Sequence, residues 1–531
     1  MKIFSGLILL LLLSTISLNT LAQQAYWVFL KDKNGVAFNP YEYFDAKAIE
    51  RRIKNGIPLN DSTDWPLNEH YVAQVAAIAD SISGQTRWFN ALAVRATGEQ
   101  IQKIKALPCV RDIRAMMYYA VPANVDVLTC YNTSKNNIRT GQLEIMGAKY
   151  FRQNGIDGKG VRIAIFDGGF PSVISNPALR HIIESKRLID TWDFTKNKAF
   201  VYYSIAHGTM VMTNIGGMKI YDTDTFRYGL ATGAEFLLAK TEIIREPLSE
   251  EKNWLMAVEW ADKNGADIIN SSLGYTYQRY FPSDMDGKTS LVSRAANMAA
   301  RKGILVVNAA GNDGDTKWHT LVAPADADSV LTVGGISPND AYHTSFSSFG
   351  PTADGRMKPN VCAYGTAIVI GKNTYDEEVD GTSFASPLVA GFAACALQAN
   401  KEMKNMELFH LIEKSGHLYP YFDYAHGYGI PQADYVLSHQ KKDIPPTFKA
   451  DFQGSEIHIQ INRDIELPIG SSYLMYINLA DEEGKLLHYF VVKVKQPDFR
   501  IDLDNYLFID MNDVSRINVY FKGYTQSYDN K

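Results

Sequence analysis

The sequence predicts an α/β fold: a doubly wound, mostly parallel sheet with helices on both faces, between a small α+β domain and a β-sandwich. Between residues 142 and 440, short apolar runs alternate with helical segments, a pattern typical of parallel sheets covered on both faces. Residues 23–117 mix short strands and helices, whereas residues 441–531 show short strands joined by turns. A chain of 531 residues is long enough to fill several cores.

The chain begins with the pattern of an export signal. Lys2 precedes an apolar run over residues 7–13, and a small-residue pattern ends at Ala22. Ser14 and Thr15 interrupt the run too early for a membrane span. We therefore expect residues 1–22 to be a signal peptide and the protein to be secreted to the medium, cell surface or periplasm, without a transmembrane segment. The net charge of -5 favours neither nucleic acid nor an anionic membrane as partner.

The first domain is expected to span residues 23–117. Helices are predicted at residues 46–54, 71–81 and 99–107, and strands at residues 26–31, 87–95 and 110–116. We interpret the basic run at residues 50–54 as a solvated helix face, with a processing or partner site as the alternative.

Residues 118–141 are predicted to be an exposed linker in which proteolysis is easiest. Periodicity fades there, and polar and turn-forming residues dominate. Four cysteines are too few for a disulfide scaffold in so long a chain, and no metal spacing joins them. Cys395 is expected in a core helix, while Cys109 and Cys130 could pair in an oxidising compartment.

The central region carries the candidate chemistry. Its strands are predicted at residues 161–166, 235–239, 267–270, 304–308 and 330–333, and helices at residues 254–263 and 291–302. Sites in parallel sheets gather beyond the carboxyl ends of the strands. Asp167 follows the first of these strands and is a candidate orienting acid, although Asp-Gly is also a common turn. His207 opens another apolar segment and is a candidate general base, with a helix-start or core histidine as the alternative.

A second group of candidates surrounds a serine at a helix start. Gly381 leads into a buried apolar helix whose first residues include Ser383, so free amides lie beside that hydroxyl. Such amides favour a developing oxyanion, although Gly-Thr-Ser is also an ordinary helix cap. Asn312 follows the strand at residues 304–308, where its amide can donate to an oxyanion or form a turn. Ser272-Leu273-Gly274 ends another strand and presents an edge that an extended peptide can pair with.

Together these residues resemble the subtilisin-like serine proteases, the subtilase family, over about residues 142–437. The order acid, histidine, serine is that of subtilisin. Three motifs match: Asp167-Gly168-Gly169, His207-Gly208-Thr209 and Gly381-Thr382-Ser383-Phe384-Ala385-Ser386-Pro387. Ser272-Leu273-Gly274 resembles the family's substrate-binding strand, and Asn312 its oxyanion asparagine.

The resemblance implies an endopeptidase that acts on proteins or peptides through a catalytic triad and an acyl-enzyme. It also implies a zymogen whose N-terminal propeptide assists folding, inhibits the active site and is cut away, here residues 23–117 with the cut in the linker. No cofactor is required for the chemistry. Many subtilases bind calcium, but no calcium loop is identified and no metal ligand is assigned. The chain departs from the family pattern at Gly168, Met210, Met212 and Tyr275, although no triad group is lost.

Residues 441–531 are predicted to form the β-sandwich. Strands are expected at residues 456–461, 473–479, 486–495 and 516–522. This domain could bind substrate, a wall component or another chain, or only stabilise the enzyme. The alternative to an endopeptidase is an inert subtilase scaffold that acts as an exported binding protein. A non-protease serine hydrolase is disfavoured, because its serine usually lies in a Gly-x-Ser-x-Gly elbow.

Overall fold

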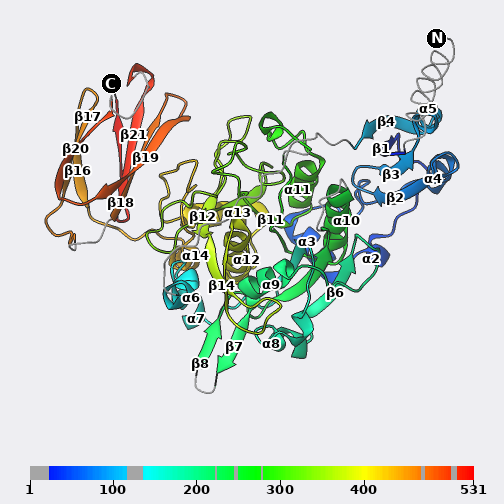
Figure 1. Cartoon of the computed structure of the whole chain (residues 1–531), viewed down its shortest axis with the longest axis horizontal. Coiled ribbons are helices and arrows are strands. Elements are labelled where there is room, and N and C mark those ends of the chain that lie inside the picture. The colour runs from blue at the N-terminus through cyan, green and yellow to red at the C-terminus, as the bar shows by residue number, and fades with distance from the viewer. Residues whose placement is uncertain are drawn as a thin grey trace, which may run out of the picture.

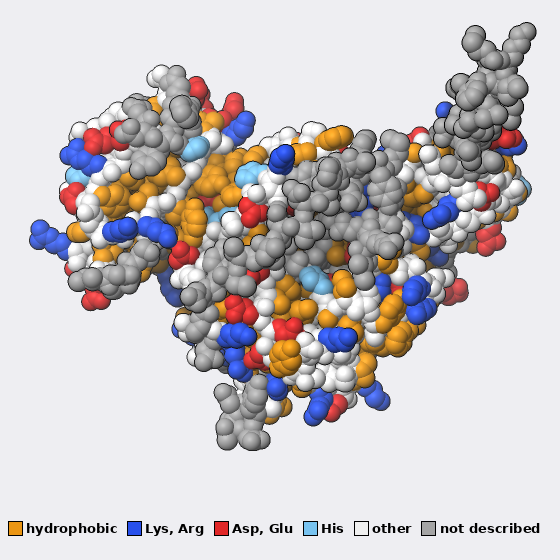
Figure 2. All heavy atoms as spheres, in the orientation of Figure 1, with side chains coloured by type: hydrophobic (Ala, Val, Ile, Leu, Met, Phe, Trp, Pro, Cys, Tyr) orange, Lys and Arg blue, Asp and Glu red, His pale blue; other side chains and the backbone are white. Residues whose placement is uncertain are grey.

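The computed structural model describes residues 23–116, 135–221, 224–243, 249–276, 279–467, 473–503 and 511–530. A large central domain lies between a small N-terminal domain and a C-terminal sandwich (Figure 1). The predicted signal peptide and most of the predicted linker fall outside the described residues. On the face in Figure 2, side chains of both charge signs are interspersed over all three domains.

The N-terminal domain is an antiparallel sheet with strand order β2-β3-β1-β4. The strands are β1 (Gln24–Leu30), β2 (Ser81–Thr86), β3 (Ala91–Ala96) and β4 (Val110–Ala115), and the helices are α2 (Pro40–Tyr43), α3 (Ala46–Asn55), α4 (Glu69–Ala76) and α5 (Gly98–Lys105). Helices α4 and α5 bury Val75, Ile101 and Ile104 against one face of the sheet. The opposite face contributes Trp27 and Phe29 to a core shared with the central domain. The α+β prediction is confirmed, but the helix expected at residues 71–81 stops at Ala76 and is followed by strand β2.

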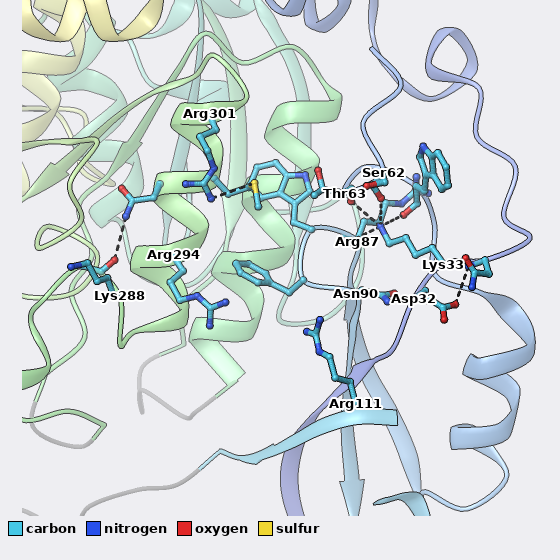
Figure 3. A pocket seen from close by; sticks show the side chains of 17 residues that line it. Asp32, Lys33, Ser62, Thr63, Arg87, Asn90, Arg111, Lys288, Arg294 and Arg301 are labelled. Atoms are coloured by element: carbon cyan, nitrogen blue, oxygen red, sulfur yellow. Dashed lines mark hydrogen bonds between the residues drawn. The ribbon is translucent and has the colours of Figure 1, made fainter. Parts of the chain in front are cut away.

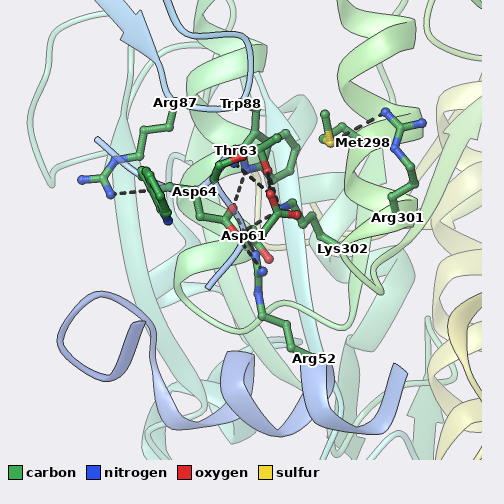
Figure 4. Close-up of polar contacts among 12 residues, drawn as sticks. Arg52, Asp61, Thr63, Asp64, Arg87, Trp88, Met298, Arg301 and Lys302 are labelled. Carbon is green, nitrogen blue, oxygen red and sulfur yellow. Dashed lines mark hydrogen bonds and ion pairs between the residues drawn. The ribbon is translucent and has the colours of Figure 1, made fainter. Parts of the chain in front are cut away.

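Helix α3 corrects the prediction made for the basic run. Arg51 and Arg52 are 3% and 0% exposed, so the interpretation as a solvated face is wrong for both. They belong to a network of three cations and three carboxylates, all buried except the partly exposed Asp61 and shown in part in Figure 4: Arg51, Arg52, Lys302, Asp61, Asp64 and Asp262. Because Asp262 and Lys302 belong to the central domain, the network joins the two domains.

The central domain is built on a seven-stranded parallel sheet of order β13-β12-β11-β10-β5-β9-β6. Its strands are β5 (Arg162–Asp167), β6 (Leu188–Asp193), β9 (Glu235–Lys240), β10 (Ile268–Ser271), β11 (Leu305–Ala309), β12 (Val330–Ile336) and β13 (Val361–Tyr364). Two hairpins flank it, β7 (Met218–Tyr221) with β8 (Asp224–Arg227), and β14 (Thr366–Val369) with β15 (Glu377–Asp380).

Helices cover both faces of this sheet, as the sequence predicts. They are α6 (Lys135–Glu144), α7 (Ala148–Gln153), α8 (Arg180–Glu184), α9 (His207–Gly216), α10 (Ser249–Lys263), α11 (Leu291–Arg301), α12 (Thr382–Ala399), α13 (Asn405–Ser415) and α14 (Ala433–Ser438), with short 3₁₀ turns at Val173–Ser175 and Pro282–Asp284. In strand β5, Ile163 and Ile165 pack in the same core as α9 and α12, whereas Ala164 and Phe166 pack in the same core as α10 and α11. This alternation is what a strand buried on two sides requires. Helix α6 begins within the predicted linker, so ordered structure starts earlier than residue 142.

Helix α12 is the one described helix long and apolar enough to cross a membrane, and 83% of it is buried in the protein core. Such burial is the behaviour of a core helix.

The C-terminal domain is a sandwich of two antiparallel sheets, of orders β16-β17-β20 and β19-β18-β21-β22. The strands are β16 (Phe448–Gln453), β17 (Glu456–Ile461), β18 (Tyr473–Ala480), β19 (Leu486–Val494), β20 (Asp498–Asp502), β21 (Arg516–Phe521) and β22 (Tyr524–Asp529), with a 3₁₀ turn at Met511–Asp513. Ile457 and Ile459 share a core with Met475 and Ile477 of the facing sheet. The predicted β-sandwich is thus confirmed. It packs on the central domain, where the Asn478 amide donates to the carbonyl of Phe422 at 2.7 Å.

Candidate active site

The predicted acid and base meet at the carboxyl edge of the central sheet. Asp167 is the last residue of β5, and His207 is the first residue of α9. His207 Nδ1 lies 2.8 Å from Asp167 Oδ2. The Gly168 amide donates to Asp167 Oδ1 at 2.7 Å, which fixes the other carboxylate oxygen. Asp167 is 1% exposed, whereas the His207 side chain is 28% exposed, so the acid is buried behind a base that reaches solvent.

The electrostatic effect of this pair falls on the imidazole. Burial disfavours the charged ring, but the charge and the hydrogen bond of Asp167 outweigh burial, and the pKa of His207 rises above its ordinary value of 6.5. A hydrogen bond at Nδ1 also leaves Nε2 as the nitrogen available for proton transfer. The pair therefore has the polarity of a general base and the group that orients it.

Ser383 lies in the first turn of α12, next to the substrate-edge segment. Its hydroxyl donates to the carbonyl of Ser272 at 3.3 Å, and the Ser272 hydroxyl donates to the carbonyl of Ser383 at 2.9 Å. The neighbouring Phe384 ring lies 5.4 Å from the His207 ring, centroid to centroid. Among the described residues, no hydrogen bond joins Ser383 to His207. The structure thus brings serine and histidine to one site with the hydroxyl turned toward Ser272.

Asn312 lies beyond β11 and is tied to the start of α12. The amide and the hydroxyl of Thr382 donate to Asn312 Oδ1 at 2.8 and 2.9 Å. Since Oδ1 is occupied, the Nδ2 hydrogens of this exposed residue are the groups left to donate outward. A side chain at Gly381, whose φ is +137°, would place its Cβ 3.3 Å from Asn312 Nδ2. Glycine at this position keeps the amide beside the helix start.

Ser272, Leu273 and Gly274 continue β10 past the sheet. The side-chain amide of Asn308 donates to the backbone carbonyl of Leu273 at 3.1 Å, and Gly274 is exposed. A Cβ at Gly274 would lie 2.4 Å from Val322 Cγ2, so this position has no room for a side chain. Gly274 therefore exposes backbone without a side chain, two residues beyond Ser272, which contacts Ser383.

Comparison with known proteins decides the family. Residues 158–429, half of the chain, match the model of the subtilase family. The chain belongs to the subtilase family. Residues 25–128 match a second model, the peptidase S8 propeptide domain of Bacteroidota. The resemblance drawn from the motifs and the assignment of the first domain as a propeptide are both confirmed.

Individual relatives agree with this assignment. The chain is 30% identical over 283 residues to subtilisin-like protease SBT6.1 of Arabidopsis thaliana, a match covering 51% of this chain and 24% of that protein. It is 32% identical over 257 residues to subtilisin DY of Bacillus licheniformis, covering 48% of this chain and 83% of that protein. Fervidolysin of Fervidobacterium pennivorans, a keratinolytic enzyme related to subtilisin, aligns with 94% of this chain and 70% of its own, at 16% identity and a TM-score of 0.54. That last likeness shows the fold alone.

The departures from the subtilase pattern have structural reasons. A Cβ at Gly168 would lie 2.5 Å from Ile205 Cδ1, so Ile205 fills the space that a Ser or Thr would need. Met212 is fully buried in the core, and Met210 packs in the same small cluster as Phe384. Tyr275 points inward, where its hydroxyl donates to Glu242 Oε1 at 2.8 Å. None of these bulky side chains replaces a group of the candidate site.

Three supporting residues of this subtilase site were not predicted from the sequence. Phe384 contacts the His207 ring, Thr382 orients Asn312, and the Asn214 amide donates to the carbonyl of Phe384 at 2.7 Å. Asn214 lies seven residues after His207, which is two helical turns, so helical spacing could have placed both on one face. The described residues contain no cluster of three or more metal-ligating side chains. Of the two cysteines that could pair, Cys109 is a free thiol near Gln74, while Cys130 lies outside the described residues.

Proposed function

We propose that this protein is a secreted serine endopeptidase, made as a zymogen, that hydrolyses peptide bonds through Asp167, His207 and Ser383. The observation that carries the proposal is the 2.8 Å bond between His207 and Asp167 beside a serine at a helix start. Family membership supports the same reaction class. Secretion rests on the sequence of residues 1–22.

The proposed reaction begins when the Ser383 hydroxyl leaves the Ser272 carbonyl and turns to His207 Nε2. His207 takes the proton as Ser383 Oγ attacks the scissile carbonyl, and the imidazolium then gives the proton to the leaving amine. Asp167 holds the ring orientation and stabilises its positive charge. Water attacks the acyl-enzyme by the same proton route in reverse, which returns Ser383 to its starting state.

The tetrahedral oxyanion would be held by two donors. One is Asn312 Nδ2, which has no hydrogen-bond acceptor among the described residues, while Thr382 holds Oδ1 in place. The other is the backbone amide of Ser383 in the first turn of α12, where helix amides have no intrahelical partner. These donors need no cofactor. A structural calcium ion remains compatible with the proposal, and no residue is assigned to it.

Substrates would be extended peptides or proteins that add a strand to Ser272, Leu273 and Gly274. The exposed backbone at Gly274 supports this mode, because main-chain hydrogen bonds give affinity that is independent of side chains.

We propose that the first domain inhibits the enzyme until it is cut within residues 118–141. Its sheet packs through Trp27 and Phe29 onto the core that includes α10 and α11. Met116, which follows β4, packs on the same cluster as Leu273 of the substrate edge. The end of β4 and the substrate edge thus pack against the same hydrophobic cluster.

A fluorophosphonate probe tests the proposed function. The processed protein should be labelled on Ser383, as located by peptide mass spectrometry, and Ser383→Ala should abolish labelling. His207→Ala should slow labelling strongly, because the serine then lacks its base. A folded parent chain that resists the probe would instead favour the alternative, an inert subtilase scaffold acting as an exported binding protein.

A further inference from the structure

A cavity of about 720 Å³ lies between the propeptide domain and the central domain (Figure 3). The propeptide side is formed by residues near β1, by residues 62–65, by residues 87–90 between β2 and β3, and by Arg111 of β4. The central-domain side is formed by residues 287–288 and by α11. Neither domain alone encloses this space.

The lining is strongly basic. Six of its residues are cationic: Lys33, Arg87, Arg111, Lys288, Arg294 and Arg301. Asp32 is the one acidic residue among the described lining residues, and it already accepts from the Asn34 amide and the Tyr71 hydroxyl. The cavity therefore carries a positive charge that its own walls do not neutralise.

Three of the cations are already engaged elsewhere. Lys33 donates to four backbone carbonyls, including those of Ser62 and Trp65. Arg87 donates to the carbonyl of Asp64 at 3.1 Å, and Lys288 lies 3.5 Å from a carboxylate oxygen of Asp354.

The other three, Arg111, Arg294 and Arg301, have no carboxylate within 4.0 Å among the described residues. Arg294 lies over the Phe89 ring at 5.2 Å from its centroid, and Arg111 lies 6.0 Å from the centroid of Phe29. Arg301 contacts the sulfur of Met298 at 3.7 Å. In Figure 3, Arg111 reaches from β4 toward Arg294 on the facing helix.

These guanidinium groups act on one another. Burial lowers the pKa of Arg294, and the like charges of Arg114, Arg111 and Arg301 lower it further. Repulsion of this kind opposes docking of the propeptide unless a negative charge enters.

We infer that this cavity binds a multiply charged oxyanion of the phosphate- or sulfate-ester class, held jointly by Arg111 of the propeptide and by Arg294 and Arg301 of the central domain. Planar guanidinium groups bind such oxygens with paired, charge-assisted hydrogen bonds. The volume lies in the range of about 300–1,000 Å³ that is usual for pockets of organic ligands, so an anion larger than inorganic phosphate fits.

The site has a regulatory consequence. Because each domain supplies part of it, the anion binds the docked zymogen and not the separated parts. A ligand that binds only the docked state must shift the equilibrium between docked and undocked propeptide toward docking. At a ligand concentration 100 times its Kd, this equilibrium constant increases about 100-fold. The anion would delay release of the propeptide. Binding itself does not depend on proteolytic activity, so it can be tested where cleavage is abolished.

The test uses the full chain with Ser383→Ala, which stays uncut. Isothermal titration calorimetry is performed with tripolyphosphate and, separately, with sucrose octasulfate, at an ionic strength held constant with sodium chloride. We expect one site per chain for at least one of these anions. Whether tripolyphosphate or sucrose octasulfate binds then shows whether the site prefers phosphate or sulfate groups. Arg111→Gln and Arg294→Gln should each weaken binding about tenfold or more.

The matched control is Arg500→Gln, an exposed arginine of the sandwich that pairs with Glu456. It should leave Kd unchanged, and Arg294→Lys should retain more affinity than Arg294→Gln. The thermal midpoint of each ligand-free variant shows that it is folded. Absence of saturable binding by both anions, or equal Kd values in the Arg294 and Arg500 variants, overturns the site. An unchanged Kd in Arg111→Gln overturns the bridging of the two domains.

Discussion

The buried network that includes Arg52 predicts that one propeptide side chain controls docking. Arg52 Nη1 lies 2.8 Å from Asp64 Oδ2, and its Nη2 lies 2.5 Å from Asp262 Oδ2. All three side chains are at most 2% exposed. Lys302, which directly follows α11, also pairs with Asp64, at 2.9 Å. The change Arg52→Met keeps most of the side-chain volume and removes the charge.

The magnitude follows from the charge balance. The network holds three cations and three carboxylates, so loss of Arg52 leaves one buried negative charge uncompensated. Breaking a buried ion pair in this way costs about 3–5 kcal/mol. That cost corresponds to a weakening of about 100- to 5,000-fold in the equilibrium between docked and undocked propeptide.

Hydrogen exchange of the α3 amides measures this effect in the full chain carrying Ser383→Ala. Where reclosing is fast, the exchange rate reports the free energy of opening. The control is Lys103→Met, which breaks an exposed pair with Glu99 and should change stability by less than about 0.5 kcal/mol. If the α3 amides exchange within threefold of the same rate in both variants, the network does not hold the propeptide in place.

Three further predictions concern pH and catalysis. Glu259 is buried under the propeptide, where it accepts hydrogen bonds from the backbone amides of residues 87 and 88. Burial raises the pKa of Glu259 from 4.5 to about 7. Between these two pH values the docked state therefore holds a proton that the undocked, exposed carboxyl releases. The contribution of Glu259 to docking should therefore be fully present below pH 4.5 and be lost as pH rises through 7, by about 3 kcal/mol in total, and Glu259→Gln should remove that part of the pH dependence in unfolding experiments. Asn312→Ala should lower kcat about 100- to 1,000-fold with little change in KM, measured on a peptide substrate. Burial lowers the pKa of His207 and the Asp167 carboxylate raises it, with a net rise, so kcat/KM should increase with pH around a midpoint above 6.5. In Asp167→Asn this midpoint should fall. An unchanged midpoint would contradict the pairing of Asp167 with His207.

Much of the central sheet could be predicted because its signals are local. The strand before Asp167 is an apolar run that ends in a carboxylate and two glycines, and each of these features acts over a few residues. The helix that begins near Ser383 is similarly marked by Gly381 and by a long apolar run. The order of the motifs along the chain then indicated that Asp167 and Ser383 belong to one site, which composition alone does not indicate.

Sequence-based prediction failed for two physical reasons. Strands β2 and β6 are half-exposed and polar, so they lack the apolar pattern that identifies a buried strand. The burial of Arg52 depends on Asp64 and Asp262, which lie 12 and 210 residues away in the sequence. The residues next to Arg52 form only a basic run, so they do not indicate this burial. Sequence reasoning likewise missed Thr382 as the group that orients Asn312, because that contact exists only after two strand ends meet.

Autoprocessing tests the central claim most directly. The chain without residues 1–22 is produced beside its Ser383→Ala twin, and both are followed by intact mass over time. The account predicts that the parent sheds an N-terminal fragment ending within residues 118–141 while the twin stays whole. If both chains are folded and neither is cut, or if both are cut alike, Ser383 is not the nucleophile that processes this protein.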